Sequence, residues 1–206
     1  MSRALLVVDV QNDFTEGGAL GVTGGDALAR RITAFLGRHA GEYDLIVGSR
    51  DWHHGDDDNG GHFAGPDGPD FVTTWPVHCV AGTAGAEYHP KLDTEPIDVH
   101  VLKGQGRPDY SAFQAHTEDG VALPEVLAER RVVTVDIVGI ATEHCVLASA
   151  LDARAAGYDV AVYDDLVVGV DEERSAQALE EIRAAGGHID HSDMDEGLAN
   201  PDGAIL

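Results

Sequence analysis

Basic residues are scarce in this sequence. Of 206 residues, 13 are Lys or Arg and 37 are Asp or Glu, so the formal net charge is −24 at pH 7. A surface of this sign repels nucleic acid phosphates and anionic lipid headgroups. We therefore expect no nucleic acid and no membrane partner, and we read the excess of acid as a solvated acidic surface.

Long apolar runs and cysteines are also scarce. No run reaches the roughly 18 apolar residues that span a bilayer, and the N-terminal stretch MSRALLVVDVQNDF lacks a signal-peptide cleavage pattern. The two cysteines, Cys79 and Cys145, do not make a disulfide framework. These absences favour a reduced, cytoplasmic setting. The length and the 43% hydrophobic content predict one domain over residues 1–206.

Apolar runs rich in Val and Ile alternate with helical patterns along the chain. Their near-continuous apolar character is typical of strands buried on both faces. The sequence therefore predicts an α/β fold, a parallel sheet between two helical layers in a three-layer αβα sandwich. The expected strands cover residues 4–10, 44–49, 97–103, 132–139 and 159–163. The expected helices cover residues 25–39, 123–130, 143–156 and 171–185.

Two segments do not follow this alternation. Residues 51–96 form a long stretch rich in Gly, Asp, His and Pro. A loop of this length is uncommon in a compact domain unless it carries function. The polar tail after His188, which includes the sequence DMDEG, is expected to form only a short terminal element.

Chemically useful side chains follow four of the expected strands. Asp9 follows the first strand, Asp51 and His53 the second, Lys103 closes the third, and Cys145 follows the fourth. Alone, each has an ordinary explanation as a turn acceptor, a surface lysine or a small buried residue. Because ligands of open parallel sheets bind at the carboxyl ends of the strands, the coincidence predicts one site.

The stretch IVGIATEHCV places a thiol where a strand changes into a helix. If Thr142 caps that helix, Cys145 lies in its first turn, where backbone N–H groups favour a thiolate and stabilise an oxyanion. Lys103 would hold the thiolate, and Asp9 would carry the proton. The pattern predicts a cysteine hydrolase.

A second group of residues has the character of a metal site. The spacing in DWH puts Asp51 and His53 on one side of an extended segment, and His62 and His78 follow in the long loop. Such ligands suit one divalent ion, zinc, iron or manganese. Cys79 is interpreted as structural, because adjacent residues of an extended chain point apart. Further candidates by residue type alone are His54, His89, His100 and His116.

Together these motifs resemble the nicotinamidase (pyrazinamidase) branch of the isochorismatase-like cysteine hydrolases. The resemblance covers residues 4 to 190, roughly, and rests on LLVVDVQNDF, VGSRDWHH, GGHF, TTWPVHCVAGTAGAEYHP, VLKGQGRPDYSAF and VDIVGIATEHCVLASALDARAAGYDV. It implies a catalytic triad of Asp9, Lys103 and Cys145. It implies a metal held by Asp51, His53 and His78, with His62 as a further ligand.

The resemblance also implies the surroundings of the substrate. A cis peptide is expected before Ala141, so that the N–H groups of Ala141 and Cys145 face the oxyanion. Phe14 and Trp75 would be aromatic walls around a pyridine ring, and Tyr110 would lie near the pocket. The metal would hold the ring nitrogen, directly or through water, and Cys145 would form a thioester with release of ammonia.

The implied function is conversion of the small molecule nicotinamide, and of pyrazinamide, to the acid. The sequence leaves alternatives open. Another amidohydrolase or ureidohydrolase of the superfamily fits the triad but not the Asp–His cluster. Isochorismatase chemistry on a vinyl ether does not need the thiol, and a catalytically silent interaction subunit does not need the triad. The metal's identity and the oligomeric state, including a homo-oligomer, are not decided by the sequence.

Overall fold

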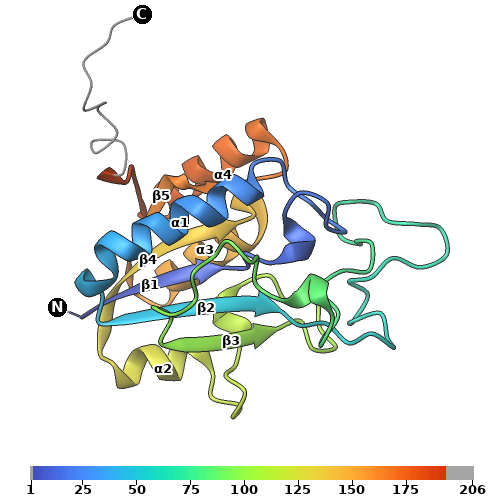
Figure 1. Ribbon diagram of the computed structural model, residues 1–206, viewed down its shortest axis with the longest axis horizontal. Helices are drawn as coiled ribbons and strands as arrows, with labels where there is room; N and C mark the ends of the chain where they lie inside the picture. Colours follow the sequence, from blue (N-terminus) through green and yellow to red (C-terminus); the bar gives the residue numbers. More distant parts are fainter. Residues whose placement is uncertain (1, 194–206) are drawn as a thin grey trace, which may run out of the picture.

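The protein is built around one parallel sheet (Figure 1). The structure, a computed structural model, describes residues 2–193. Its six strands lie in the order β3-β2-β1-β4-β5-β6, and every neighbouring pair is parallel. The strands are β1 Ser2–Val8, β2 Leu45–Asp51, β3 Val99–Lys103, β4 Val132–Ile140, β5 Asp159–Val168 and β6 His188–Asp190. The predicted α/β class with a parallel sheet is confirmed.

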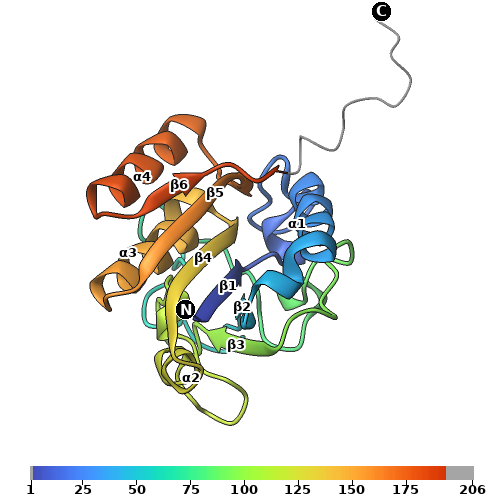
Figure 2. The same ribbon diagram turned by 90° about the vertical axis from the view of Figure 1, so that its left-hand side faces the viewer.

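Helices cover both faces of the sheet (Figure 2). Helix α1, Gly25–His39, packs on one face through an apolar stripe that includes Leu28, Ile32 and Phe35. The other face carries α2 Leu123–Glu129, α3 Leu147–Ala155 and α4 Glu172–Ala184. The predicted three-layer αβα sandwich is therefore confirmed.

Strand β1 shows why the apolar runs are continuous rather than alternating. Leu6 and Val8 belong to the core under α2 and α3, whereas Leu5 and Val7 belong to the core under α1. Each of the four is at most 1% exposed. A central strand has no solvated face, so both sets of alternate positions must be apolar.

Some element boundaries differ from the sequence prediction. Strand β1 ends at Val8, because Asp9 takes a left-handed conformation with φ 49°. Strand β5 continues to Val168. The short terminal element is a sixth strand, β6, which the sequence analysis missed because its three residues carry no buried apolar run. Residues 194–206, with most of the DMDEG sequence, lie outside the described residues.

The segment between β2 and β3 crosses the carboxyl edge of the sheet with little regular structure. Its only helical element in the described chain is one 3₁₀ turn, Ala84–Ala86. Isolated bridges hold it in place, His53 with Val80 and Phe63 with Trp75.

No helix within residues 2–193 has both the length and the apolar character needed to cross a bilayer.

The strand order fixes where a ligand binds. The chain runs outward from β1 through β2 to β3, then returns to place β4 on the other side of β1. Ligands of open α/β sheets bind outside the carboxyl ends of the strands at such a reversal. The residues that follow β1 and β4 therefore face a common crevice.

Candidate active site

Asp9, Lys103 and Cys145 meet at the reversal point of the sheet. The Lys103 Nζ atom lies 2.9 Å from Asp9 Oδ2 and 3.6 Å from Cys145 Sγ. It also contacts Asp51 Oδ1. Asp9 and Lys103 are essentially without solvent exposure. The structure thus brings together the three side chains that the sequence placed at three strand ends.

The Asp9 carboxylate is held by strand β2. The Ser49 hydroxyl donates to Asp9 Oδ1 at 2.6 Å, and the Asp9 N–H donates to the Ser49 carbonyl at 3.3 Å. These two bonds fix both ends of a residue whose backbone has left the strand conformation. Sequence analysis did not single out Ser49, because a serine inside a strand gives no signal of its partner.

The Lys103 ammonium forms ion pairs with two carboxylates, those of Asp9 and Asp51. Burial raises the pKa of Asp9, the Asp51 charge adds to this, and the Lys103 ammonium opposes it. Burial also acts to raise the pKa of Asp51, but the charge of the Lys103 ammonium outweighs it and holds that pKa below its usual range. Asp9 is therefore the more basic carboxylate of the two and the better acceptor for a proton.

The thiol environment differs from the sequence expectation. Ala141, not Thr142, is the N-cap of the turn, and no side chain caps it. Residues Thr142–Val146 form one π-helical turn before α3, with the Val146 N–H bonded to the Ala141 carbonyl. Burial raises the pKa of the Cys145 thiol well above its usual range, against the Lys103 ammonium. Burial thus favours the neutral thiol, and a nearby base is needed to take its proton.

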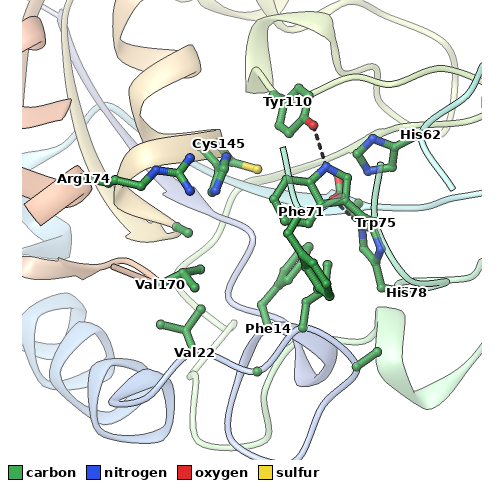
Figure 3. A pocket seen from close by; sticks show the side chains of 16 residues that line it. Phe14, Val22, His62, Phe71, Trp75, His78, Tyr110, Cys145, Val170 and Arg174 are labelled. Atoms are coloured by element: carbon green, nitrogen blue, oxygen red, sulfur yellow. Dashed lines mark hydrogen bonds and ion pairs between the residues drawn. The ribbon is translucent and has the colours of Figure 1, made fainter. Parts of the chain in front are cut away.

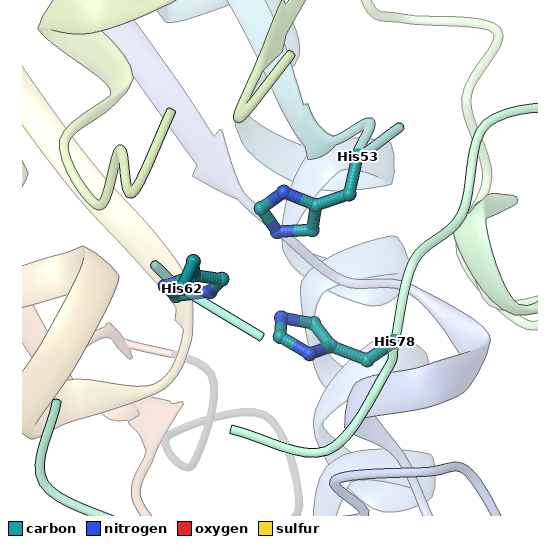
Figure 4. Close-up of side chains that lie close together, drawn as sticks. All are labelled: His53, His62 and His78. Atoms are coloured by element: carbon teal, nitrogen blue, oxygen red, sulfur yellow. The ribbon is translucent and has the colours of Figure 1, made fainter. Parts of the chain in front are cut away.

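Three histidines converge beside this group (Figure 4). One ligand nitrogen from each of His53, His62 and His78 lies within 4.8 Å of the other two. Asp51 Oδ2 lies 3.5 Å from His53 Nε2 and 3.8 Å from His78 Nε2. Burial lowers the pKa of His62 to about 3 and also lowers that of His78, so both rings are neutral and keep a lone pair.

The ring orientations fit a bound cation. His53 Nδ1 donates to the Gly104 carbonyl at 2.8 Å, and His78 Nδ1 donates to the Pro76 carbonyl at 2.7 Å. In a neutral ring, donation from Nδ1 leaves the lone pair of Nε2 free, as in a metal ligand with a second partner. Among the described residues, the buried His53 Nε2 and His62 Nδ1 have no hydrogen-bond partner. Buried nitrogen atoms without a hydrogen-bond partner are suited to bind one divalent ion.

Gly104 allows His53 to approach the backbone. Its φ is +82°, and a Cβ there would lie 2.4 Å from His53 Cε1. A larger residue would therefore displace the imidazole, so this glycine is part of how the histidine is aimed.

The other candidate residues lie outside the three-histidine group. His54 contacts Asp57, His89 contacts Asp26 and His100 contacts Tyr88, while His116 pairs through its backbone with Leu102. Cys79 is buried, and its N–H donates to Asp13 Oδ2 at 2.7 Å. Its position agrees with the structural interpretation.

A cavity of about 420 Å³ opens above the thiol (Figure 3). Phe14, Trp75 and Tyr110 line it, together with Asp51, His62, His78 and Cys145. The Trp75 indole N–H donates to the Tyr110 hydroxyl at 2.7 Å, so these two rings support one another. Ala141 also lines the cavity, and the peptide bond before it is cis, as expected.

Several lining residues were not found from the sequence. They come from the loop after β1, the long segment, the turn that carries Cys145, and the region from the end of β5 into α4. They include Leu20, Val22, Phe71, His144, Val170 and Arg174. His144 precedes Cys145 directly in the sequence, and this position could have identified it as a residue of the site. Arg174 lies in the exposed first turn of α4, and nothing in the local sequence connects it with the site.

Glu143 holds the loop between β5 and α4, which carries Val170. Its Oε1 accepts the N–H groups of Val170 and Asp171 at 2.9 and 3.0 Å, and its Oε2 accepts the Ser175 hydroxyl at 3.2 Å. The first helical turn of α4 is thereby tied to the turn that carries Cys145.

Comparison with known proteins shows the family of the chain. The chain is 48% identical to the nicotinamidase/pyrazinamidase of Mycobacterium tuberculosis, over 89% of this chain and 95% of that protein. A pyrazinamidase of Pyrococcus horikoshii in complex with zinc superposes with a TM-score of 0.78 at 37% identity, over 93% of this chain and 100% of that one. PnC1 from L. infantum in complex with nicotinate gives 0.77 at 32%, over 92% of each chain. Residues 3–193 match the isochorismatase domain, and the chain belongs to the isochorismatase family.

Proposed function

We propose that the protein is a nicotinamidase that converts nicotinamide, and pyrazinamide, to the acid and ammonia through a cysteine thioester. One observation carries this proposal. A buried Asp9–Lys103–Cys145 contact lies under an aromatic cavity and beside a three-histidine group. The family and its nicotinamidase relatives support an amidohydrolase of this kind.

The first half of the reaction forms the thioester. Asp9 takes the thiol proton of Cys145 as the sulfur attacks the amide carbon. Lys103 contacts both groups, so its ammonium stabilises the negative charge whether it lies on oxygen or on sulfur. Asp9 then gives the proton to the amide nitrogen, the carbon–nitrogen bond breaks, and ammonia leaves.

The second half restores the enzyme. Asp9 takes a proton from water, the water oxygen attacks the thioester carbon, and the carbon–sulfur bond breaks. Asp9 returns the proton to the Cys145 sulfur, and the acid product gives its remaining proton to the released ammonia or to solvent and leaves as nicotinate. One water is consumed and one ammonia is released. The raised pKa of Asp9 suits a group that accepts and donates a proton in each half.

The cavity supplies orientation. The backbone N–H groups of Ala141 and Cys145 would donate to the oxyanion, since both residues line the cavity in which the amide would lie. Phe14 and Trp75 would hold the flat ring, and Tyr110 supports Trp75 through the bond to its indole. Holding the carboxamide against the thiol contributes several kcal/mol to rate by positioning.

Asp51, His53, His62 and His78 would hold the divalent ion. When bound, the ion offers a Lewis-acid position for the ring nitrogen of the substrate. The residues around it then keep the ligands in place, since the Gly104 and Pro76 carbonyls fix two of the imidazoles.

The test is ammonia release from nicotinamide by purified protein of known metal content. We expect turnover in the parent and none in Cys145→Ala, with the fold and the metal retained and no trappable thioester. Residual turnover above about a tenth of the parent rate would contradict the nucleophile assignment.

The domain limits 1–206, the cytoplasmic setting and a homo-oligomer remain predictions.

A further inference from the structure

The cavity extends beyond the part that a pyridine carboxamide would occupy. In Figure 3, His62 and His78 lie at one end, Arg174 at the other, and Cys145 between them. In the proposed function the ring nitrogen faces the imidazoles and the carboxamide faces the thiol. The end with Arg174 is then left open. A volume of about 420 Å³ is in the range of ligands larger than one ring.

An outer groove continues this end of the cavity. The groove has a volume of about 640 Å³ and shares Tyr110, His144 and Arg174 with the cavity. Its floor is the apolar face of α3, formed by Leu147, Ala148 and Leu151. A ring substituent that points away from the imidazoles would therefore pass the three shared residues and reach solvent along the groove.

Arg174 gives this passage a free positive charge. Its side chain is exposed, and within residues 2–193 its guanidinium forms no hydrogen bond or ion pair. Glu143, the acid that lines the groove, already accepts from two backbone N–H groups and from the Ser175 hydroxyl. In a chain of net charge −24, an unpaired guanidinium at a cavity mouth is a local site for an anion.

His144 offers a second donor at the same place. Its ring is stacked with Tyr110 at a centroid distance of 6.2 Å and meets Trp75 edge-on at 5.1 Å. Burial lowers the pKa of His144, so the ring is neutral and keeps one N–H donor. Both side chains thus present donors where cavity and groove join.

We propose that Arg174 and His144 form an anion subsite, and that the substrates of this enzyme include pyridine carboxamides with a carboxylate on a ring carbon that is not bonded to the ring nitrogen. The inference rests on the proposed function. It makes Arg174 a specificity residue, because a guanidinium pairs with a carboxylate through two parallel bonds that a neutral group of the same shape lacks.

The test compares two substrates of matched shape. One is 5-carboxynicotinamide, and the other is 5-acetylnicotinamide, which has a neutral substituent. We expect the parent to favour the carboxylate in kcat/KM, and Arg174→Gln to lower the ratio of the two values about tenfold. The control is Arg183→Gln, which removes a charge from the last turn of the same helix, where Arg183 pairs with Glu180. It should leave the ratio unchanged.

A binding measurement separates this inference from the proposed function. Calorimetry with the Cys145→Ala protein reports affinity for both compounds without turnover. Tighter binding of the carboxylate, lost in Cys145→Ala/Arg174→Gln, supports the subsite even if nicotinamide is not the substrate. Equal binding of the two compounds, or an equal loss for both in the Arg174 variant, overturns it.

Discussion

Gln11 lies in the segment after β1, and its buried side chain acts as a clamp. It hydrogen-bonds this segment to the end of β2 and to the 3₁₀ turn Ala84–Ala86. Its Nε2 donates to the carbonyls of Asp51 and Ala86, both at 2.8 Å, and its Oε1 accepts the Asp51 N–H at 2.8 Å. The side chain has no solvent exposure. Replacing Gln11 by Leu keeps the approximate volume and removes all three bonds, leaving two carbonyls and one N–H buried without partners.

The expected cost follows from those three groups. Each buried polar group left unpaired costs about 1–3 kcal/mol, and partial relaxation lowers the sum to about 3–5 kcal/mol. For a domain of this size, that corresponds to a fall in Tm on the order of 10 °C. Since the clamp holds the backbone of a proposed metal ligand, we also expect metal affinity to fall about tenfold or more.

The assay is urea unfolding followed by circular dichroism, with excess chelator so that metal binding does not contribute. Metal affinity is measured separately by competition. The matched control is Asn12→Ala, which removes one exposed bond from Asn12 to the Ala84 carbonyl and should cost less than about 1 kcal/mol. If Gln11→Leu costs no more than this control, the reasoning is refuted.

Three further results are expected. Lys103→Met should move the pH profile of Cys145 alkylation further upward, because burial already raises that pKa and the ammonium opposes it; an unmoved profile would assign Lys103 another role. Glu143→Ala should lower stability by about 2 kcal/mol in thermal unfolding, since the N–H groups of Val170 and Asp171 lose their acceptor; a change under about 0.5 kcal/mol would contradict this. Removal of metal should collapse the preference for nicotinamide over benzamide, which lacks the ring nitrogen, while alkylation of Cys145 continues; a preference retained by folded, metal-free protein would exclude that role for the ion.

The sheet and its active edge could be predicted because the relevant signals are local. Continuous apolar runs mark strands with two buried faces, and a parallel sheet sends all their carboxyl ends to one side. Asp9, Asp51, Lys103 and Cys145 could therefore be expected together without any knowledge of distances. The same reasoning missed β6, whose three residues are too polar and too few to give a pattern.

The rest of the site depends on contacts between distant segments. Ser49 and Gln11 matter through their partners, and no local pattern identifies a hydrogen-bond partner some 40 positions away. Thr142 was a reasonable cap by residue type, but the chain enters the helix through a π turn and leaves that hydroxyl without a capping role. The sequence predicted a thiolate from the position of Cys145 at a helix start, but it does not show that the sulfur is buried, which raises the pKa of the thiol.

The three groups of the triad come from the residue after β1, the end of β3 and the turn after β4, and each is separated from the next by a long stretch of chain. No single hairpin or helix pair contains more than one of them. Closing such distant contacts is slow compared with helix formation. During refolding, helical signal should therefore return before hydrolysis does, and recovered activity reports completion of the four adjacent strands from β3 to β4.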